Sequence, residues 1–104
     1  SNDYGYENWI SKALDFYADP GDVVILISSS GQSKNMLVGA KKAKSMNVNV
    51  ITFSGFLENN PLRMLGDINF WVDSKIYNIV EMVHNIWLLA IVDYLADKNN
   101  GVSS

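Results

Sequence analysis

The sequence predicts an α/β fold in which helices lie on both sides of a parallel β-sheet, in three layers. The apolar run VVILI at 23–27 does not alternate with polar residues, which is typical of a strand covered on both faces. Strand-like and helical segments follow each other along the chain, as expected for parallel strands joined by right-handed crossovers. The 104 residues, 48% of them apolar, suffice for one domain with a modest core.

The individual elements are predicted from hydrophobic spacing and from the residues that interrupt it. Apolar residues recur every three or four positions in YGYENWISKALDFYA, and the breaker DPGD ends this helical pattern. GFLENNPLRMLG is predicted to be a loop with one helical turn, and the small polar tail KNNGVSS, residues 98–104, is expected to be frayed and flexible. The predicted elements are a helix at 4–18, a strand at 23–27, a helix at 34–46, strands at 48–54 and 68–72, and a helix at 75–97.

The composition argues against several classes of protein. The net charge of −3 and the single basic run, KKAK, argue against a broad nucleic-acid surface, and we interpret the run as a solvated helix face. The apolar run IWLLAIV is shorter than the roughly 20 residues of a membrane-spanning helix, and no signal-peptide pattern opens the sequence. Without cysteine there is neither a disulfide framework nor a thiolate metal site. We therefore expect a cytoplasmic protein that binds neither nucleic acid nor membrane.

Four serines and a glycine stand where the first predicted strand ends. The segment SSSGQSKN places Ser28, Ser29, Ser30 and Ser33 at the carboxyl edge of the sheet, where ligands bind in such folds. Amide groups at a helix start are unpaired donors at the positive end of the dipole, so added hydroxyls suit a phosphate. The alternative is a plain turn in which Ser33 caps the next helix. The segment matches neither the dinucleotide fingerprint nor a Walker A loop.

The last predicted helix carries a short polar arc. Asn78, Glu81, His84 and Asn85 fall within about 120° of an otherwise apolar helix. Glu81 and His84 lie three residues apart, so they could act as base and acid or share a metal ion. The alternative is a partly hydrated helix end at a subunit contact, with the histidine satisfied by hydrogen bonds.

Two motifs resemble the sugar isomerase (SIS) domain family. The stretch GDVVILISSSGQSKNMLVGAKKAKSMNVNVITFSG is similar to the family core, in which a Gly-Asp strand leads into Ser-x-Ser-Gly-x-Ser and the next strand ends in Thr-x-Ser/Thr-Gly. The opening SNDYGYE is similar to the phosphoheptose isomerase branch, whose members interconvert sedoheptulose 7-phosphate and a heptose phosphate for bacterial surface sugars. The resemblance implies a parallel sheet of the flavodoxin-like or Rossmann-like SIS type.

The resemblance also implies roles for individual residues. The four serines Ser28, Ser29, Ser30 and Ser33 would hold the phosphate of the sugar, and Asn2 and Asp3 would face its hydroxyls. From the residues alone, Asn2 and Asp3 are better explained as a helix cap, because Asp3 is followed by Glu7 and an amphipathic run.

The sequence departs from the family in two places. The family's last helix carries a glutamine and, eight residues later, a histidine, and we align these positions with Val80 and Leu88. The family's Gly-Asn-Gly-Gly-Ser turn, with the histidine and catalytic glutamate that follow it, has no counterpart here. We therefore expect residues 1–97 to be a partial SIS domain that lacks the amino-terminal helices and first strand and is inactive alone. No metal ligand is assigned in this chain, and a zinc ion would belong to the full-length protein.

Two functions follow from the resemblance. The first is an isomerase of aldose and ketose phosphates, in which Glu81 is the candidate base and His84 its partner. The second is a non-catalytic module that senses a phosphosugar or binds a protein. In either case residues 76–96 are apolar on nearly every face, so we expect them to form a homodimer or homotetramer interface.

Overall fold

The structure is a computed structural model that describes residues 3–99, and side chains from Trp9 to Lys98. Its elements follow in the predicted order, and each boundary lies within two residues of the prediction. Helix α3 extends two residues into the tail predicted to be frayed, and residues 100–104 lie outside the described part. The elements are α1 (Asp3–Tyr17), β1 (Val23–Ile27), α2 (Lys34–Ser45), β2 (Asn49–Ser54), β3 (Ile68–Trp71) and α3 (Tyr77–Asn99).

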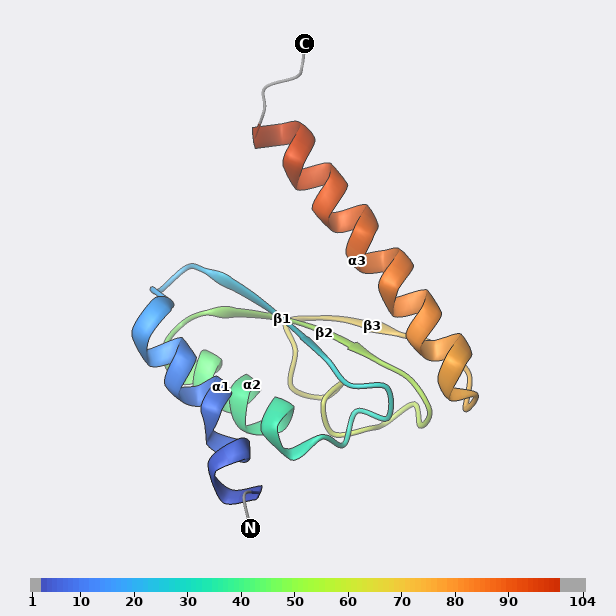
Figure 1. Cartoon of the computed structure of the whole chain (residues 1–104), viewed down its shortest axis with the longest axis horizontal. Coiled ribbons are helices and arrows are strands. Elements are labelled where there is room, and N and C mark those ends of the chain that lie inside the picture. Colours follow the sequence, from blue (N-terminus) through green and yellow to red (C-terminus); the bar gives the residue numbers. More distant parts are fainter. Residues whose placement is uncertain (1–2, 100–104) are drawn as a thin grey trace.

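The strands form a parallel sheet in the order β1-β2-β3. Ile27 pairs with Phe53, and Ser54 pairs with Trp71, so the carboxyl ends of all three strands meet at one edge. Figure 1 shows α1 and α2 on one side of the sheet and α3 on the other. The predicted three-layer α/β fold is therefore confirmed.

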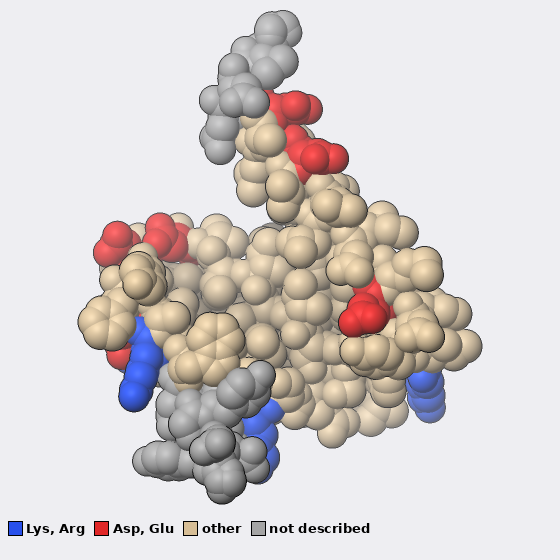
Figure 2. Space-filling view, in the orientation of Figure 1, with Lys and Arg blue, Asp and Glu red and all other residues tan. Residues whose placement is uncertain are grey.

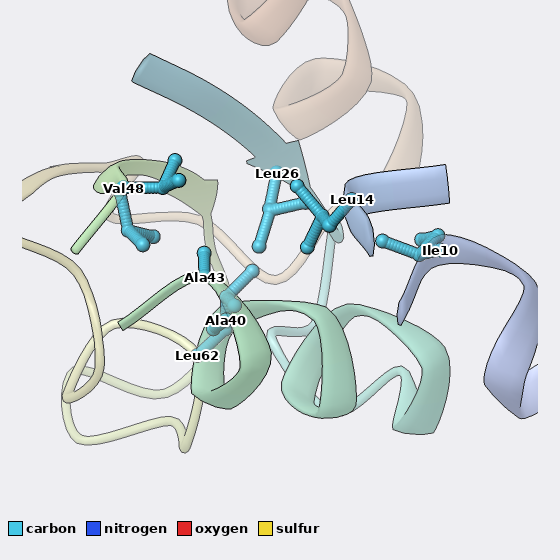
Figure 3. Close-up of a cluster of buried hydrophobic side chains, with 8 residues drawn as sticks. Ile10, Leu14, Leu26, Ala40, Ala43, Val48 and Leu62 are labelled. Carbon is cyan, nitrogen blue, oxygen red and sulfur yellow. The ribbon is translucent and has the colours of Figure 1, made fainter. Parts of the chain in front are cut away.

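The face covered by α1 and α2 holds an aliphatic core (Figure 3). Val50, at the centre of β2, is fully buried, as are Ala40 and Ala43 of α2. The small alanine side chains let the helix backbone approach its neighbours closely. We call this set the aliphatic cluster, and its buried members are Ile10, Leu14, Leu26, Ala40, Ala43, Val48, Val50 and Leu62.

The opposite face of the sheet meets α3 through rings. Phe53 follows Val50 in β2 at odd spacing, so its side chain points to the other face, where it is fully buried. Its ring centroid lies 5.5 Å from Phe70, 5.7 Å from His84 and 5.8 Å from Trp87. These four residues form the aromatic cluster, which fixes the first half of α3 to the sheet. The second half projects away from it (Figure 1).

Helix α3 carries apolar side chains that the described chain does not cover. Ile86 is 59% exposed and Leu89 is 63% exposed. Charged side chains are sparse over the molecular face in Figure 2, and acidic groups lie near the carboxyl end of α3. Within the described residues, Tyr77–Lys98 is the one helix long and apolar enough to cross a membrane, with a mean hydropathy of 1.5. The prediction from the run IWLLAIV alone underestimated the length of the apolar segment, because apolar residues continue on both sides of that run.

Candidate functional site

Serine hydroxyls hold the loop after β1, residues 28–33, which we call the serine loop. The Ser28 amide continues the sheet by donating to the carbonyl of Phe53 at 3.0 Å. Ser28 Oγ then accepts from the amides of Gly31 at 3.1 Å and Ser33 at 3.4 Å, and Ser30 Oγ accepts from the amide of Gln32 at 3.3 Å. Three successive amide groups therefore point into the loop and onto serine oxygens.

Gly31 lets a second loop pack against the serine loop. Its φ of 72° is in the left-handed region, and a Cβ there would lie 1.9 Å from Oδ1 of Asn60. Asn60 is 1% exposed and donates to Ser54 Oγ at 3.1 Å and to the carbonyl of Gly55 at 3.2 Å. The Leu62 amide donates to the carbonyl of Gly31 at 3.0 Å. The loop 55–66 therefore packs against the serine loop and supports it at Gly31.

Ser33 stands at the N-cap position of α2 without capping the helix. Its backbone is extended, with φ −66° and ψ 122°, but its side chain makes no cap hydrogen bond. The hydroxyl donates to Oδ1 of Asn35 instead. Ser33 is therefore at the predicted cap position, but the expectation that its hydroxyl caps the helix is wrong. Because first-turn amides have no acceptor within a helix, the start of α2 presents donors and a positive dipole end to the loop.

A pocket of about 400 Å³ lies between the serine loop and the first half of α3. It brings together Ser29, Ser30, Glu81 and His84, four of the residues that the sequence predicted. Ser28 and Ser33 are outside its lining, because their hydroxyls are used within the loop and with Asn35. The lining residues are Ile27, Ser29, Ser30, Phe56, Tyr77, Glu81, His84 and Asn85.

Tyr77, which was not among the predicted site residues, lines the pocket between Ser29 and Glu81. Its hydroxyl donates to Oε2 of Glu81 at 3.1 Å, and the Ser29 side chain lies on the other side of the same pocket, where it acts on the pKa of Tyr77. The bond to the Glu81 carboxylate, with its negative charge, raises the pKa of Tyr77, and the Ser29 side chain acts in the opposite direction. The available signal was the four-residue spacing between a tyrosine and a glutamate on one helix.

His84 is tied to the sheet edge. It is 2% exposed, and its Nε2 lies 2.9 Å from the carbonyl oxygen of Ser54. A carbonyl only accepts, so Nε2 carries the proton and Nδ1 carries a lone pair. Nδ1 is buried and has no hydrogen-bond partner within the described part of the chain. Burial lowers the pKa of His84, which favours a neutral ring.

This arrangement separates the two residues proposed for catalysis. Glu81 is exposed and lines the pocket, whereas His84 has one nitrogen engaged and the other enclosed. His84 is therefore held at the contact between helix and sheet by one of its two ring nitrogens, and it is not the hydrated, fully hydrogen-bonded histidine of the alternative. Glu81 is left as the titratable carboxylate of the pocket.

Val80 packs against the end of β2 and does not reach the pocket. It is fully buried, and a Cβ on Gly55 would lie only 2.7 Å from its Cγ1. The position that we aligned with the family's glutamine therefore belongs to the contact between α3 and the sheet. Glu81, the next residue, is the one on this turn that lines the pocket. Leu88 is partly buried and outside the lining.

Three features complete the description of the site. Among the described residues, no group of three or more His, Cys, Asp or Glu side chains could hold a metal ion, so these residues alone do not fit a zinc site. The pocket lining contains no lysine or arginine, so any anion would be held there by neutral donors. Asn2 lies outside the described residues, as does the side chain of Asp3, whose backbone begins α1.

Comparisons with known proteins agree on one family. Residues 1–55 match the sequence profile of the SIS domain. The chain is 38% identical over 84 residues to a probable phosphoheptose isomerase of Thermoplasma acidophilum, covering 81% of this chain and 46% of that relative. It is 30% identical over 103 residues to a phosphoheptose isomerase of Helicobacter pylori, covering 95% of this chain and 53% of the relative.

Solved structures share the fold. A phosphoheptose isomerase from Neisseria gonorrhoeae superposes with a TM-score of 0.79 at 29% identity, covering 88% of this chain and 52% of that one. A second from Francisella tularensis gives a TM-score of 0.80 at 23% identity, over 88% and 51% of the two chains. The chain thus spans about half the length of the relatives that it matches.

Proposed function

The chain belongs to the SIS domain family, and we propose that it is the phosphosugar-binding part of an aldose–ketose isomerase similar to the phosphoheptose isomerases. One observation carries the proposal, namely the pocket that joins the serine loop to Glu81. At one end it has Ser29 and Ser30, whose hydroxyls are neutral donors and whose loop leads into the start of α2. At the other end it has a carboxylate. These two ends match a ligand with a phosphate at one end and hydroxyl-bearing carbons at the other.

The serine loop is suited to exchange partners with a phosphate. In the structure the amides of Gly31, Gln32 and Ser33 are bonded to serine oxygens at 3.1–3.4 Å. Phosphate oxygens are charged and therefore stronger acceptors than hydroxyl oxygens. Binding would move these amides and the serine hydroxyls onto the anion, with the dipole of α2 behind them. Such a site needs no lysine or arginine.

Glu81 is the base that this pocket offers for isomerisation. The reaction moves a proton between neighbouring carbons through an enediol or enediolate, so it needs a base beside those carbons and an anchor at the far end. The Tyr77 hydroxyl, 3.1 Å from Oε2 of Glu81, orients the carboxylate on the helix surface. His84 would support this turn of α3 through Ser54, as a positioning residue.

A second function has its own support. Val80 is buried against Gly55, and Leu88 is outside the pocket. His84 lines the pocket, but its Nε2 is bonded to Ser54 and its Nδ1 is buried, so neither nitrogen is available to a ligand. A pocket with these features retains the anion site while it lacks side chains that the family's enzymes use. A non-catalytic phosphosugar-sensing or protein-binding module is therefore the alternative function.

Titration calorimetry with sedoheptulose 7-phosphate on the intact gene product tests the binding proposal. Replacing Ser29 or Ser30 with alanine removes a hydrogen bond to a charged group, worth about 1.5–3 kcal/mol, so affinity should fall roughly 10- to 100-fold. Ser45→Ala, at the opposite end of α2, is the matched control and should bind as wild type. Unchanged affinity in both loop variants would overturn the proposal.

A turnover assay separates the two functions. If the protein is an isomerase, Glu81→Gln should abolish interconversion of the ketose and aldose phosphates while retaining ligand binding. Binding of the sugar phosphate by the wild-type protein without any turnover would instead establish the sensing module. We place either form in the cytoplasm, where sugar phosphates are made and used.

We also propose that α3 is the centre of a homodimer or homotetramer interface. Its exposed apolar side chains need a cover, and the polar groups Glu81, His84 and Asn85 in its first half favour protein over lipid as that cover. Trp87 packs within the chain against Phe53 and Phe70, so it is an unsuitable probe of assembly.

Ile86 and Leu89 are better probes because both are more than half exposed. Changing both to glutamate should convert the oligomer to a monomer, as measured by light scattering on the intact gene product. Lys41→Glu, on the exposed side of α2, should leave assembly unchanged. A wild-type monomer, or a wild-type protein that partitions into phospholipid vesicles, would contradict the proposal.

A further inference from the structure

Phe56 has a backbone conformation that phenylalanine rarely adopts. Its φ is 63°, in the left-handed region, where the Cβ of an L-residue crowds the following carbonyl. In the described residues the other non-glycine with positive φ is Asn47, and asparagine is the side chain best able to tolerate it. A bulky residue held in this way indicates that the surrounding structure imposes the conformation or that the side chain serves a purpose.

The neighbouring backbone imposes the conformation without help from the ring. The Phe56 amide donates to the carbonyl of Ser74 at 2.9 Å. The carbonyl of Gly55 accepts from Asn60, and Gly55 itself is confined between Val80 and the carbonyl of Ser29. These contacts involve main-chain atoms of residues 55 and 56. A glycine at position 56 would make the same hydrogen bonds with less strain.

The ring of Phe56 is not needed for either core. In the part of the chain that the structure describes, Phe56 belongs to neither the aliphatic cluster nor the aromatic cluster. It is half-buried and lines the pocket together with Ser29, Ser30 and Glu81. The strain is therefore kept at a position whose side chain borders the proposed ligand site.

We propose that Phe56 is a specificity-determining residue whose ring packs against the C–H face of the sugar carbons, between the phosphate end and Glu81. This inference rests on the proposed function. A carbon chain with hydroxyls on one side presents C–H groups on the other, and an aromatic ring contacts such a surface at little entropic cost. Inorganic phosphate has no such surface, so the contact discriminates phosphosugars from free phosphate.

The test measures the affinities for two ligands and the thermal midpoint of unfolding, all in the intact gene product. Phe56→Gly should weaken sedoheptulose 7-phosphate about three- to tenfold, the range expected for loss of one aromatic contact. Inorganic phosphate should bind the variant within about twofold of wild type, because its partners are in the serine loop. The thermal midpoint should stay level or rise, since glycine relieves the left-handed strain. Phe56→Tyr, which keeps the ring, should restore the affinity for the sugar phosphate.

Two further variants keep the inference open to refutation. Phe56→Leu keeps apolar bulk without an aromatic face and should lose affinity as glycine does, even if the glycine variant folds poorly. Phe16→Ala removes an exposed phenylalanine outside the pocket and should bind both ligands as wild type.

The outcomes separate this inference from the function on which it rests. A wild-type protein that binds neither ligand refutes the proposed function. A wild-type protein that binds both, with glycine and leucine variants of unchanged affinity, overturns the role of Phe56 alone. A glycine variant that loses both ligands and melts at a lower temperature also overturns it, because the ring would then be structural.

Discussion

The two faces of the sheet are built from different residues and do different work. The face under α1 and α2 is mainly aliphatic, and its buried polar side chain Thr52 donates to Oδ1 of Asn69 on the neighbouring strand. The face under α3 is aromatic, includes the buried His84, and ends at the pocket beside the serine loop. The first face stabilises the fold by excluding water, and the second combines packing with the polar groups of a site.

The two faces also differ in how far each is covered. Two helices cover the first face, whereas α3 lies over the second with its amino-terminal half alone (Figure 1). The uncovered part of the second face is at the amino ends of the strands, where Val23 of β1 is 59% exposed and Ile68 of β3 is 54% exposed. The first turns of α3 lie at the carboxyl edge beside the serine loop, where ligands bind in such folds, so the candidate site is at the covered end of this face.

Among changes that test the difference between the two faces, the largest loss of stability is expected in the aromatic cluster. Phe53→Ala should lower the free energy of unfolding by about 3–5 kcal/mol, because the residue is fully buried and contacts three rings. Denaturant titration measures the loss. Hydrogen exchange should then report faster exchange in α3 than in α1 or α2.

Leu26→Ala is the counterpart on the aliphatic face. Leu26 is 4% exposed, and its truncation should cost about 2–5 kcal/mol. Here the protection of α1 and α2 should fall first, while α3 keeps its own. If both variants loosen all three helices equally, the two faces do not act as separate units.

A smaller effect should appear as pH dependence on the α3 face alone. The sequence has one histidine, and burial holds the pKa of His84 below its ordinary value of 6.5. Below pH 6.5 the unfolded chain therefore binds a proton that the folded chain resists. Stability should decrease as the pH falls from 6.5 toward the lower pKa of the folded state, and should be unaffected by this group above about pH 7.5.

Denaturant titrations between pH 8 and pH 5.5 measure this dependence, in a range where ordinary carboxylates stay ionised. His84→Gln can still donate to the carbonyl of Ser54 and should flatten the pH profile. Its side chain has no titrating group. A profile of unchanged slope in the glutamine variant would assign the dependence to other residues.

Sequence predicted the elements because each is a local pattern. VVILI, the breaker DPGD and the spacing of apolar residues fixed boundaries within two residues of the structure. The serine loop and Glu81 were also accessible, because a parallel sheet brings strand ends together. Family resemblance then supplied the chemical identity of the expected ligand.

What the sequence could not predict depends on contacts between distant residues. The bond from His84 to Ser54 joins residues 30 positions apart, at a distance that follows only from the folded chain. The bonds of Ser28 and Ser33 are local, but their partners depend on the turn of the loop, in which Gly31 has a φ of 72°. The left-handed Phe56 has no signal in its own residue type, which disfavours that conformation. Tyr77 had a spacing signal, but its link to Ser29 crosses from α3 to the serine loop.

The smallest effect predicted for the second face is a pair of opposite shifts in the pKa of Tyr77, caused by changes at Glu81 and at Ser29. Its hydroxyl donates to Glu81, which stabilises the protonated phenol and raises the pKa of Tyr77 above 10.0. The Ser29 side chain acts in the opposite direction, because it stabilises the phenolate and lowers the pKa. Glu81→Gln should therefore bring the pKa of Tyr77 down toward its ordinary value, whereas Ser29→Ala should raise it further.

Carbon-13 NMR of ring-labelled tyrosine follows this titration, with Tyr77→Phe identifying the signal among the five tyrosines. Inorganic phosphate supplies the decisive comparison. If the anion draws the Ser29 hydroxyl away from Tyr77, saturating phosphate should raise the pKa of Tyr77 in the wild-type protein as Ser29→Ala does, and should change it little in that variant. Shifts of the same sign in both variants, or no response to phosphate, would mean that Tyr77 does not link the serine loop to Glu81. The opposite signs matter because a general loosening of α3 would move the pKa in one direction only.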